Sequence, residues 1–412
     1  MQFNRRTVLL GSSAALLSAC TGGAVSTPTA REPAWPKSPN AGYDQWVAAY
    51  KNRAAGRGIS QTTLDTAFRG AGYLPGVIER DRNQTEFTRT LEDYLAIAAS
   101  DERVATGKQM LSRYGSTLRA IESQYRVEPK VVTAIWGLES RYGARRGNAP
   151  VISALSTLAY DGRRGEFFEK QLTAALRILQ NGDTTPANLT GSWAGAMGHT
   201  QFIPTSYLAY AVDFTGDGRR DIWSDDPTDA LASAAAYLKR SGWTHGQPWG
   251  VEVRLPSGFN TGLAGRGSTR STSSWASLGV RDVRGNTVPD YGPASVIIPS
   301  GASGPAFMTF RNFTVITRYN NSQSYVIGVG HLADRIVGGQ PIQGNFPPDK
   351  YGMTLDDRKE LQSRLTRAGY DTGGADGVIG SKTTAAIQGY QSANGLTVDG
   401  QPSLALLNRL RG

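Results

Sequence analysis

The sequence contains few of the residues that build disulfides and metal centres. Its 412 residues include one cysteine and three histidines, and His199, His245 and His331 lie far apart. A single cysteine excludes an internal disulfide and any structural zinc site built on cysteine. The wide spacing of the histidines argues against a histidine-rich metal centre.

Charged residues are also sparse, at 19% of the chain, and one sign dominates. Lys and Arg number 44 against 34 Asp and Glu, a net charge of +10, which favours an anionic partner: nucleic acid, a membrane surface or an acidic polymer. Hydrophobic residues make up 39%, enough for a sizeable core and too many for wholesale disorder. At this length we expect roughly two or three domains.

The N-terminus has the parts of a secretory signal peptide. A basic region with Arg5-Arg6 precedes an apolar stretch, residues 7–17, which is shorter than the ~20 residues of a membrane span. Leu17-Ser18-Ala19-Cys20 resembles a bacterial lipobox. We therefore expect a signal peptide over residues 1–19 and lipidation of Cys20. The alternative is an ordinary cleavage site with an incidental cysteine.

The residue after the cysteine, Thr21, favours the periplasmic face of the outer membrane, because an aspartate there would mark retention at the inner membrane. Residues 4–9 (NRRTVL) are similar to a twin-arginine signal, so the export route stays open. An exported protein does not meet nucleic acid. We therefore expect its positive charge to face another anionic polymer, the cell wall.

Composition divides the mature chain. Residues 20–41 are rich in Gly, Ser, Thr and Pro and predict a flexible tether. Residues 43–240 show apolar spacings of three and four, typical of amphipathic helices. Short alternating runs between glycine-rich turns predict a small β-rich insert at about 249–310. Residues 313–337 predict a strand followed by a helix.

One predicted helix carries a single carboxylate. In residues 129–143 (PKVVTAIWGLESRYG), Pro129 suits the first helical turn and Gly143 the C-terminal end. The residues between them are almost wholly apolar, so we expect burial on most sides. Glu139 is the only acidic residue in this segment.

Helical spacing places Glu139 beside Trp136 and Ile135. Apolar, aromatic surroundings disfavour the charged carboxylate and raise its pKa, as a general acid near neutral pH requires. The alternative is a buried structural glutamate paired with Arg141 or Arg145.

A second block, residues 191–207 (GSWAGAMGHTQFIPTSY), combines small residues with polar ones. Glycine and alanine let a backbone or a ligand approach closely. Ser192 and Gln201 supply hydroxyl and amide groups of the kind that bind hydroxyl- and acetamido-bearing sugars. Both side chains could instead cap helices or satisfy backbone groups.

The Glu139 helix and residues 191–207, together with residues 312–320 (NFTVITRYN) and Tyr325, resemble the lytic murein transglycosylase B family. The resemblance covers most of residues 43–337, with the motifs in the family's order and spacing. Members are membrane-bound lipoproteins that cleave peptidoglycan.

The resemblance implies a mainly α (α+β) fold: a lysozyme-like helical catalytic domain over residues 42–340, which includes the β-rich insert. It makes Glu139 the catalytic acid/base. The residues to which it gives substrate-binding roles are Ser192, Gln201, Tyr319, Asn320 and Tyr325. Core packing remains an alternative for the two tyrosines.

The implied reaction cleaves the β-1,4 bond between N-acetylmuramic acid (MurNAc) and N-acetylglucosamine (GlcNAc). Glu139 protonates the linking oxygen. It then removes a proton from the C6 hydroxyl of the same muramyl ring, which attacks C1 and leaves a 1,6-anhydromuramyl end. The chemistry needs no cofactor. Two alternatives stay open: a lysozyme-like muramidase that uses water, and a non-catalytic peptidoglycan-binding lipoprotein.

Residues 213–218 (DFTGDG) predict an EF-hand-like loop for a structural Ca²⁺ or Na⁺. Gly218 suits the sharp turn at position six of such a loop. The family resemblance closes the loop with a later aspartate, for which Asp225 is a rival. The predicted ligands are Asp213, Thr215, Asp217 and Asp229. A plain Asp-Gly turn and a calcium sensor are the alternatives.

The C-terminal residues 355–412 resemble the small three-helix peptidoglycan-binding module of many wall enzymes, after a proline-containing linker at 341–354. The motifs that carry this resemblance are Leu361-Gln362, Asp376-Gly377, Tyr390-Gln391 and Asp399-Gly400. Such a module holds an enzyme on its insoluble substrate. The expected partners are glycan strands and, through Cys20, outer-membrane lipid; other wall enzymes stay open.

Overall fold

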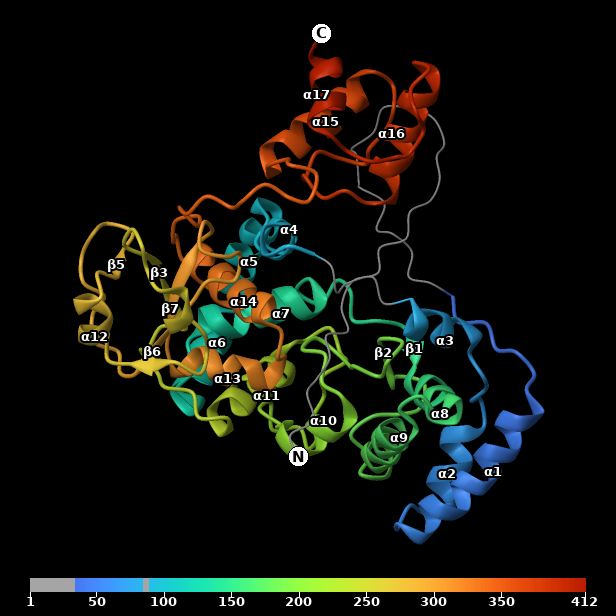
Figure 1. Cartoon of the computed structure of the whole chain (residues 1–412). Helices are drawn as coiled ribbons and strands as arrows, with labels where there is room; N and C mark the ends of the chain where they lie inside the picture. Colours follow the sequence, from blue (N-terminus) through green and yellow to red (C-terminus); the bar gives the residue numbers. More distant parts are fainter. Residues whose placement is uncertain (1–33, 84–88) are drawn as a thin grey trace. The chain divides into compact units, whose positions relative to one another are not determined.

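The computed structural model describes residues 34–83 and 89–412 (Figure 1). The described chain forms two compact units, one of residues 34–83 and 113–240 and the other of residues 89–112 and 241–412. The predicted signal peptide and Cys20 lie outside the described residues. In the part of the chain that is described, no helix is long and apolar enough to cross a membrane.

The first unit is helical, as predicted for this stretch of the chain. Its helices are α1 (Ala41–Gly56), α2 (Gln61–Phe68), α3 (Pro75–Arg82), α6 (Gly115–Tyr125), α7 (Pro129–Ser140), α8 (Val151–Asp161), α9 (Gly165–Gln180), α10 (Pro204–Tyr210) and α11 (Thr228–Arg240). One antiparallel pair, β1 (Ala149–Pro150) with β2 (Thr190–Gly191), joins the loops that follow α7 and α9.

Three helices of this unit are buried on every side. All residues are buried from Val131 to Ser140 in α7, from Val151 to Ala159 in α8 and from Asp229 to Leu238 in α11. Helices that are buried all round form the core of a domain, and other helices cover them. α8 packs along α9, and α7 packs against α6 and α11.

The first unit begins before α1. Ser38 pairs with Tyr73, and the indole Nε1 of Trp35 donates a hydrogen bond to Asn148 Oδ1 at 2.7 Å. The last residues of the predicted tether therefore pack against this unit, and only the part before residue 34 lies outside the described chain.

The second unit contains α4 (Leu91–Ala98), α5 (Asp101–Arg113) and the predicted β-rich insert, which is a five-stranded antiparallel sheet. The strand order is β4 (Thr269–Arg270), β6 (Ala294–Ile297), β7 (Ala306–Thr309), β3 (Gly250–Arg254) and β5 (Arg281–Asp282). A short helix, α12 (Thr272–Ser277), was not predicted. It brings Trp275 into the core of the insert, where its Nε1 donates to Ala294 O at 2.9 Å.

The strand predicted at the start of residues 313–337 is wrong, because this segment forms two helices, α13 (Arg311–Tyr319) and α14 (Gln323–Ile336). Its β-branched residues suggested a strand. Tertiary packing favours a helix instead, because Phe313, Ile316 and Tyr319 recur at helical spacing and are buried on one face. The burial of this face overrides the local preference.

The C-terminal residues form the three predicted helices, α15 (Leu355–Arg367), α16 (Ser381–Ala393) and α17 (Leu404–Arg411). In both Asp-Gly turns, a glutamine side chain forms hydrogen bonds to the aspartate and to the glycine. Gln362 accepts from Gly377 N at 2.6 Å and donates to Asp376 Oδ1 at 3.1 Å. In the second turn, Gln391 accepts from Gly400 N at 2.9 Å and donates to Asp399 Oδ1 at 2.7 Å. The predicted fold class is confirmed.

Candidate active site

The central feature of the candidate site is the last turn of α7, which carries Glu139. This side chain is 6% exposed. As predicted, Pro129 occupies the first turn and the helix is buried along its length. The chain then leaves the helix through three left-handed residues, Arg141, Tyr142 and Gly143. Burial and the partial negative charge at a helix C-terminus both disfavour a charged carboxylate.

The loop between β2 and α10 carries the other motif of this unit, residues 191–207. Its glycines serve close backbone packing: a Cβ on Gly191 would lie 2.2 Å from Ala196 O, and one on Gly198 the same distance from Ile222 O. The expected close approach at these two positions is therefore that of one backbone segment to another.

Ser192 and Gln201 both make hydrogen bonds within this loop. Ser192 Oγ accepts from Ala196 N at 3.0 Å. Gln201 Nε2 donates to Gly198 O at 2.8 Å and to Arg146 O at 2.9 Å, which orients the side-chain amide. The backbone of Gln201 is left-handed, with φ 52°, a strained conformation that is concentrated at functional sites.

His199 connects this loop to α7, a role that the sequence did not indicate. Trp136 Nε1 donates to His199 Nδ1 at 3.0 Å, and Ser140 Oγ donates to the carbonyl of His199 at 2.6 Å. On the far side of the ring, Nε2 donates to Ser224 O at 2.7 Å. These partners fix the neutral imidazole with its proton on Nε2. Burial lowers the pKa of His199, and the nearby Arg146 acts in the same direction.

Arg146, which the sequence also did not indicate, holds residues 223–225, the segment that accepts the hydrogen bond from His199. Its guanidinium donates to the carbonyl oxygens of Trp223 and Ser224 at 2.8 and 2.7 Å and forms an ion pair with Asp225 at 2.8 Å. Asp225, the rival cation ligand, thus has a cationic partner of its own. Neither His199 nor Arg146 lies in a periodic pattern that would reveal it from sequence.

Three of the predicted cation ligands lie together. Carboxylate oxygens of Asp213, Asp217 and Asp229 fall within 4.8 Å of one another. The fourth predicted ligand, Thr215, donates from its hydroxyl to Asp213 Oδ1 at 3.2 Å. Gly218 has a φ of 88°, as the predicted sharp turn requires.

Asp229, at the start of α11, is the buried member of this cluster. Its Oδ1 accepts from the N–H groups of Phe214 and Thr215, and its Oδ2 accepts from that of Asp221. Burial raises the pKa of Asp229, whereas these backbone bonds favour its ionised form. Oxygen donors of this type suit a hard cation.

The remaining predicted residues belong to the second unit. Tyr319 ends α13, Asn320 caps it, and Tyr325 lies in the first turn of α14. Both tyrosines are almost completely buried. Asn320 Oδ1 accepts from Ser322 N at 3.0 Å, which fixes the turn between the two helices.

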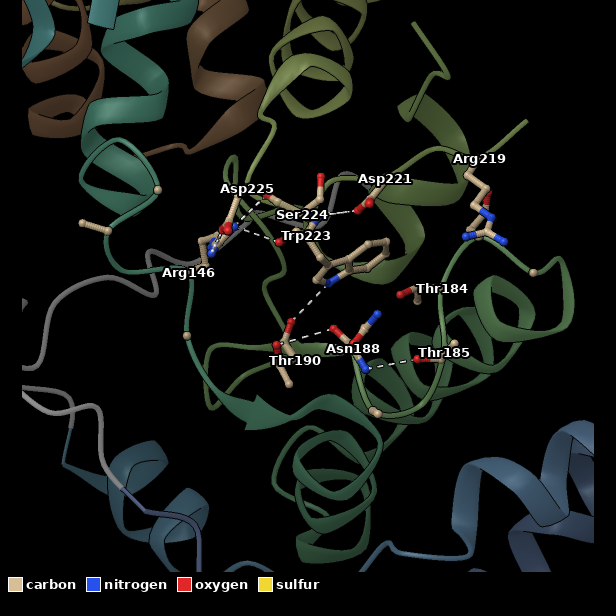
Figure 2. A pocket seen from close by; sticks show the side chains of 16 residues that line it. Arg146, Thr184, Thr185, Asn188, Thr190, Arg219, Asp221, Trp223, Ser224 and Asp225 are labelled. Carbon is tan, nitrogen blue, oxygen red and sulfur yellow. Dashed lines mark hydrogen bonds and ion pairs between the residues drawn. The ribbon is translucent and has the colours of Figure 1, made fainter. Parts of the chain in front are cut away.

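A cavity of about 640 Å³ opens beside the loop that follows α7 (Figure 2). Loop residues 143–147, 182–190 and 219–225 contribute to its lining, which is mostly polar. Trp223 lies at its centre and donates from Nε1 to Thr190 O at 3.2 Å. Glu139, Ser192 and Gln201 do not belong to this lining.

Comparison with known proteins finds two family matches. The family described as transglycosylase SLT domain matches residues 42–334, and the peptidoglycan binding domain family matches residues 354–410. A curated relative, membrane-bound lytic murein transglycosylase B of Escherichia coli K12, is 34% identical over 242 residues. That match spans 57% of this chain and 64% of the relative's length.

Solved structures show the same likeness. SltB3 of Pseudomonas aeruginosa in complex with NAG-anhNAM-pentapeptide is 47% identical, with a TM-score of 0.73 over 90% of this chain and all of that one. The Escherichia coli lytic transglycosylase Slt35 in complex with calcium is 30% identical, with a TM-score of 0.59 over 72% of this chain and 93% of that one.

The packing at the end of α7 predicts a large cost for Gly143→Ala. The new Cβ would lie 2.5 Å from the His199 ring, at a φ of 88°. Left-handed strain and the displaced ring together should lower the free energy of unfolding by about 2 to 4 kcal/mol in urea titrations.

The control is Gly58→Ala, which has a similar φ of 83° and no atom within 4 Å of the new Cβ. Its free energy of unfolding should fall only by the cost of the left-handed backbone, about 1 kcal/mol. Equal losses for the two variants would contradict the close packing of Gly143 on His199.

Proposed function

We propose, from the premise that this chain belongs to the transglycosylase SLT domain family, that it is a lytic transglycosylase of peptidoglycan. The family prediction is confirmed, since the match covers residues 42–334 and the C-terminal module matches its own family. The observation that carries the proposal is a carboxylate, Glu139, buried in the last turn of an otherwise apolar helix.

In the proposed reaction Glu139 acts twice. Its protonated carboxyl first donates to the oxygen that links MurNAc to GlcNAc, and the bond from C1 to that oxygen breaks. The carboxylate then accepts the proton of the C6 hydroxyl, whose oxygen forms the new bond to C1. The glutamate ends protonated, no water is consumed and no cofactor is required. Burial suits the first step, because it favours the protonated carboxyl before cleavage.

We also assign substrate-binding roles to the residues that the family resemblance indicates. In the first unit these are Ser192 and Gln201, and the strained backbone of Gln201 supports this role. In the second unit they are Tyr319, Asn320 and Tyr325. The ligand in the SltB3 complex, NAG-anhNAM-pentapeptide, is of the class that this reaction produces.

Glu139→Gln tests the catalytic assignment. Purified sacculi digested with residues 21–412 should release fragments with 1,6-anhydromuramyl ends, detected by mass spectrometry. The variant should release at least about 100-fold less, because the amide can neither donate nor accept the proton at this position.

A variant that ends at residue 354 should keep the activity on soluble fragments but sediment less with sacculi.

Three outcomes would contradict this proposal. Reducing muramyl ends in the wild-type digest would make the protein a muramidase. Equal release by Glu139→Gln would show that another group is the catalyst. Binding of sacculi with no release by the wild-type protein would leave only a wall-binding lipoprotein.

We propose a catalytic domain over residues 42–340 that includes the insert at about 249–310, a linker over 341–354 and a peptidoglycan-binding module over 355–412. The module's separate core supports the last boundary to within two residues, because Met353 of the linker also belongs to that core. That core consists of Met353, Leu361, Leu365, Ala386, Ile387, Leu406 and Leu407. The role of the module is to keep the enzyme on its substrate.

We also propose a structural Ca²⁺ site on the loop that α11 closes. Its ligands would be Asp213, Thr215, Asp217 and Asp229, and the cluster of three carboxylates supports it. The site would have no part in bond cleavage. The calcium complex of Slt35 is the precedent among relatives.

Calcium at ten times its dissociation constant should stabilise the wild-type protein by about 1.4 kcal/mol, measured as a rise in Tm relative to chelator. Asp217→Asn should weaken this effect, because it removes one negative charge from the site. Its amide oxygen can still accept from Arg219 N, as Asp217 Oδ1 does now, so the turn should keep its form. Asp225→Asn is the matched control and should respond to calcium like the wild type. A calcium effect lost in the control but kept in Asp217→Asn would identify Asp225 as the ligand.

For location, we propose a lipoprotein at the periplasmic face of the outer membrane, exported by residues 1–19 and anchored by Cys20. The membrane-bound curated relative supports this location. Cys20→Ser should move the protein from the membrane fraction to the soluble periplasm. A variant that still sediments with the outer membrane would show that lipidation of Cys20 is not the anchor.

A further inference from the structure

We propose that His199 is a positioning residue that holds α7, and with it Glu139, in the geometry that catalysis needs. This inference rests on the proposed function. It assigns no proton transfer to the imidazole. The ring acts by connecting the helix that carries the carboxylate to the loop that carries Ser192 and Gln201.

His199 is fixed at four atoms. Its backbone N–H donates to Ile222 O at 3.1 Å, and its carbonyl accepts from Ser140 Oγ at 2.6 Å. Its Nδ1 accepts from Trp136, and its Nε2 donates to Ser224 O. Two of the four partners, Trp136 and Ser140, lie on α7 on either side of Glu139.

Aromatic packing restricts the indole of Trp136 in addition to its hydrogen bond to His199. Tyr114, Tyr142 and His199 meet it edge-on, with ring centroids 5.4 to 5.7 Å away. Tyr142 in turn fits against Gly137, where an added Cβ would lie 2.6 Å from the phenol ring. The buried indole N–H needs an acceptor, and His199 Nδ1 supplies it.

This arrangement matters for catalysis because Glu139 must reach two different oxygen atoms of the substrate in turn. Trp136 and Glu139 are three residues apart and share one face of α7, so a rotation of the helix that moves one moves the other. A displacement of about 1 Å can lower the rate 100-fold. Substrate affinity depends on other groups and should not change.

The test compares His199→Phe, which removes both ring nitrogens, with His199→Asn, whose side-chain oxygen can still accept from Trp136. The substrate is a purified tetrasaccharide of two GlcNAc–MurNAc units. We expect His199→Phe to lower kcat about 10- to 100-fold with KM unchanged. His199→Asn should recover most of this loss.

Trp136→Phe provides the reciprocal change. If both residues act through the same hydrogen bond, the kcat loss of the double variant with His199→Phe should be smaller than the product of the single losses. The matched control is Tyr50→Phe, which removes the hydrogen bond between the hydroxyl of the buried Tyr50 on α1 and Thr173 Oγ1 on α9. It should keep the wild-type kcat. If His199→Phe does not fold, kcat of His199→Asn and of Trp136→Phe is compared with that of the wild type instead.

A readout that does not depend on activity separates this inference from the proposed function. Amide hydrogen exchange in residues 136–143 should be faster in His199→Phe than in the wild type and in Tyr50→Phe. Unchanged exchange there would overturn the inference even if the wild-type protein proved inactive. Full kcat in folded His199→Phe would also overturn it, whereas absence of anhydromuramyl products from the wild type would count against the proposed function alone.

Discussion

The hydrogen bonds between His199 and the last two turns of α7 are the constraint on which the rest of the candidate site depends. α7 is buried on all sides, and its hydrogen bonds to His199 add to the packing that holds it. Trp136 and Ser140 both bond to His199, which itself is held by Ile222 and Ser224. Through these contacts, the loop with the polar motif and the helix with the carboxylate form one assembly.

The same assembly connects to the cation loop through backbone groups. Asp229 accepts from Asp221 N, Asp221 Oδ1 accepts from Ser224 N, and Ser224 O accepts from His199. Residues of this loop thereby help to hold the segment that bonds to His199, although the proposed cation ligands and the proposed catalytic residue are different residues. This explains how a cation could matter for stability while taking no part in the chemistry.

Much of the fold could be predicted from sequence, because its signals are local. The proline that opens α7, the apolar residues that follow and the alternating runs of the insert each indicate one structure. The first half of residues 313–337 misled the prediction, since its β-branched residues favour a strand and only tertiary packing makes it helical. His199 and Arg146 could not be found in this way. Their partners are 23 to 79 residues distant in the chain, and no local pattern encodes such contacts.

The central claim is that one buried glutamate cleaves the glycan by transferring the bond at C1 to the C6 oxygen of the same sugar, with water excluded. Digestion of sacculi in water enriched in ¹⁸O tests it most directly, by mass spectrometry of the released muropeptides. The account predicts anhydromuramyl products that contain no ¹⁸O. One ¹⁸O atom at C1 of the released muramyl residues would show that water attacks, and would contradict it.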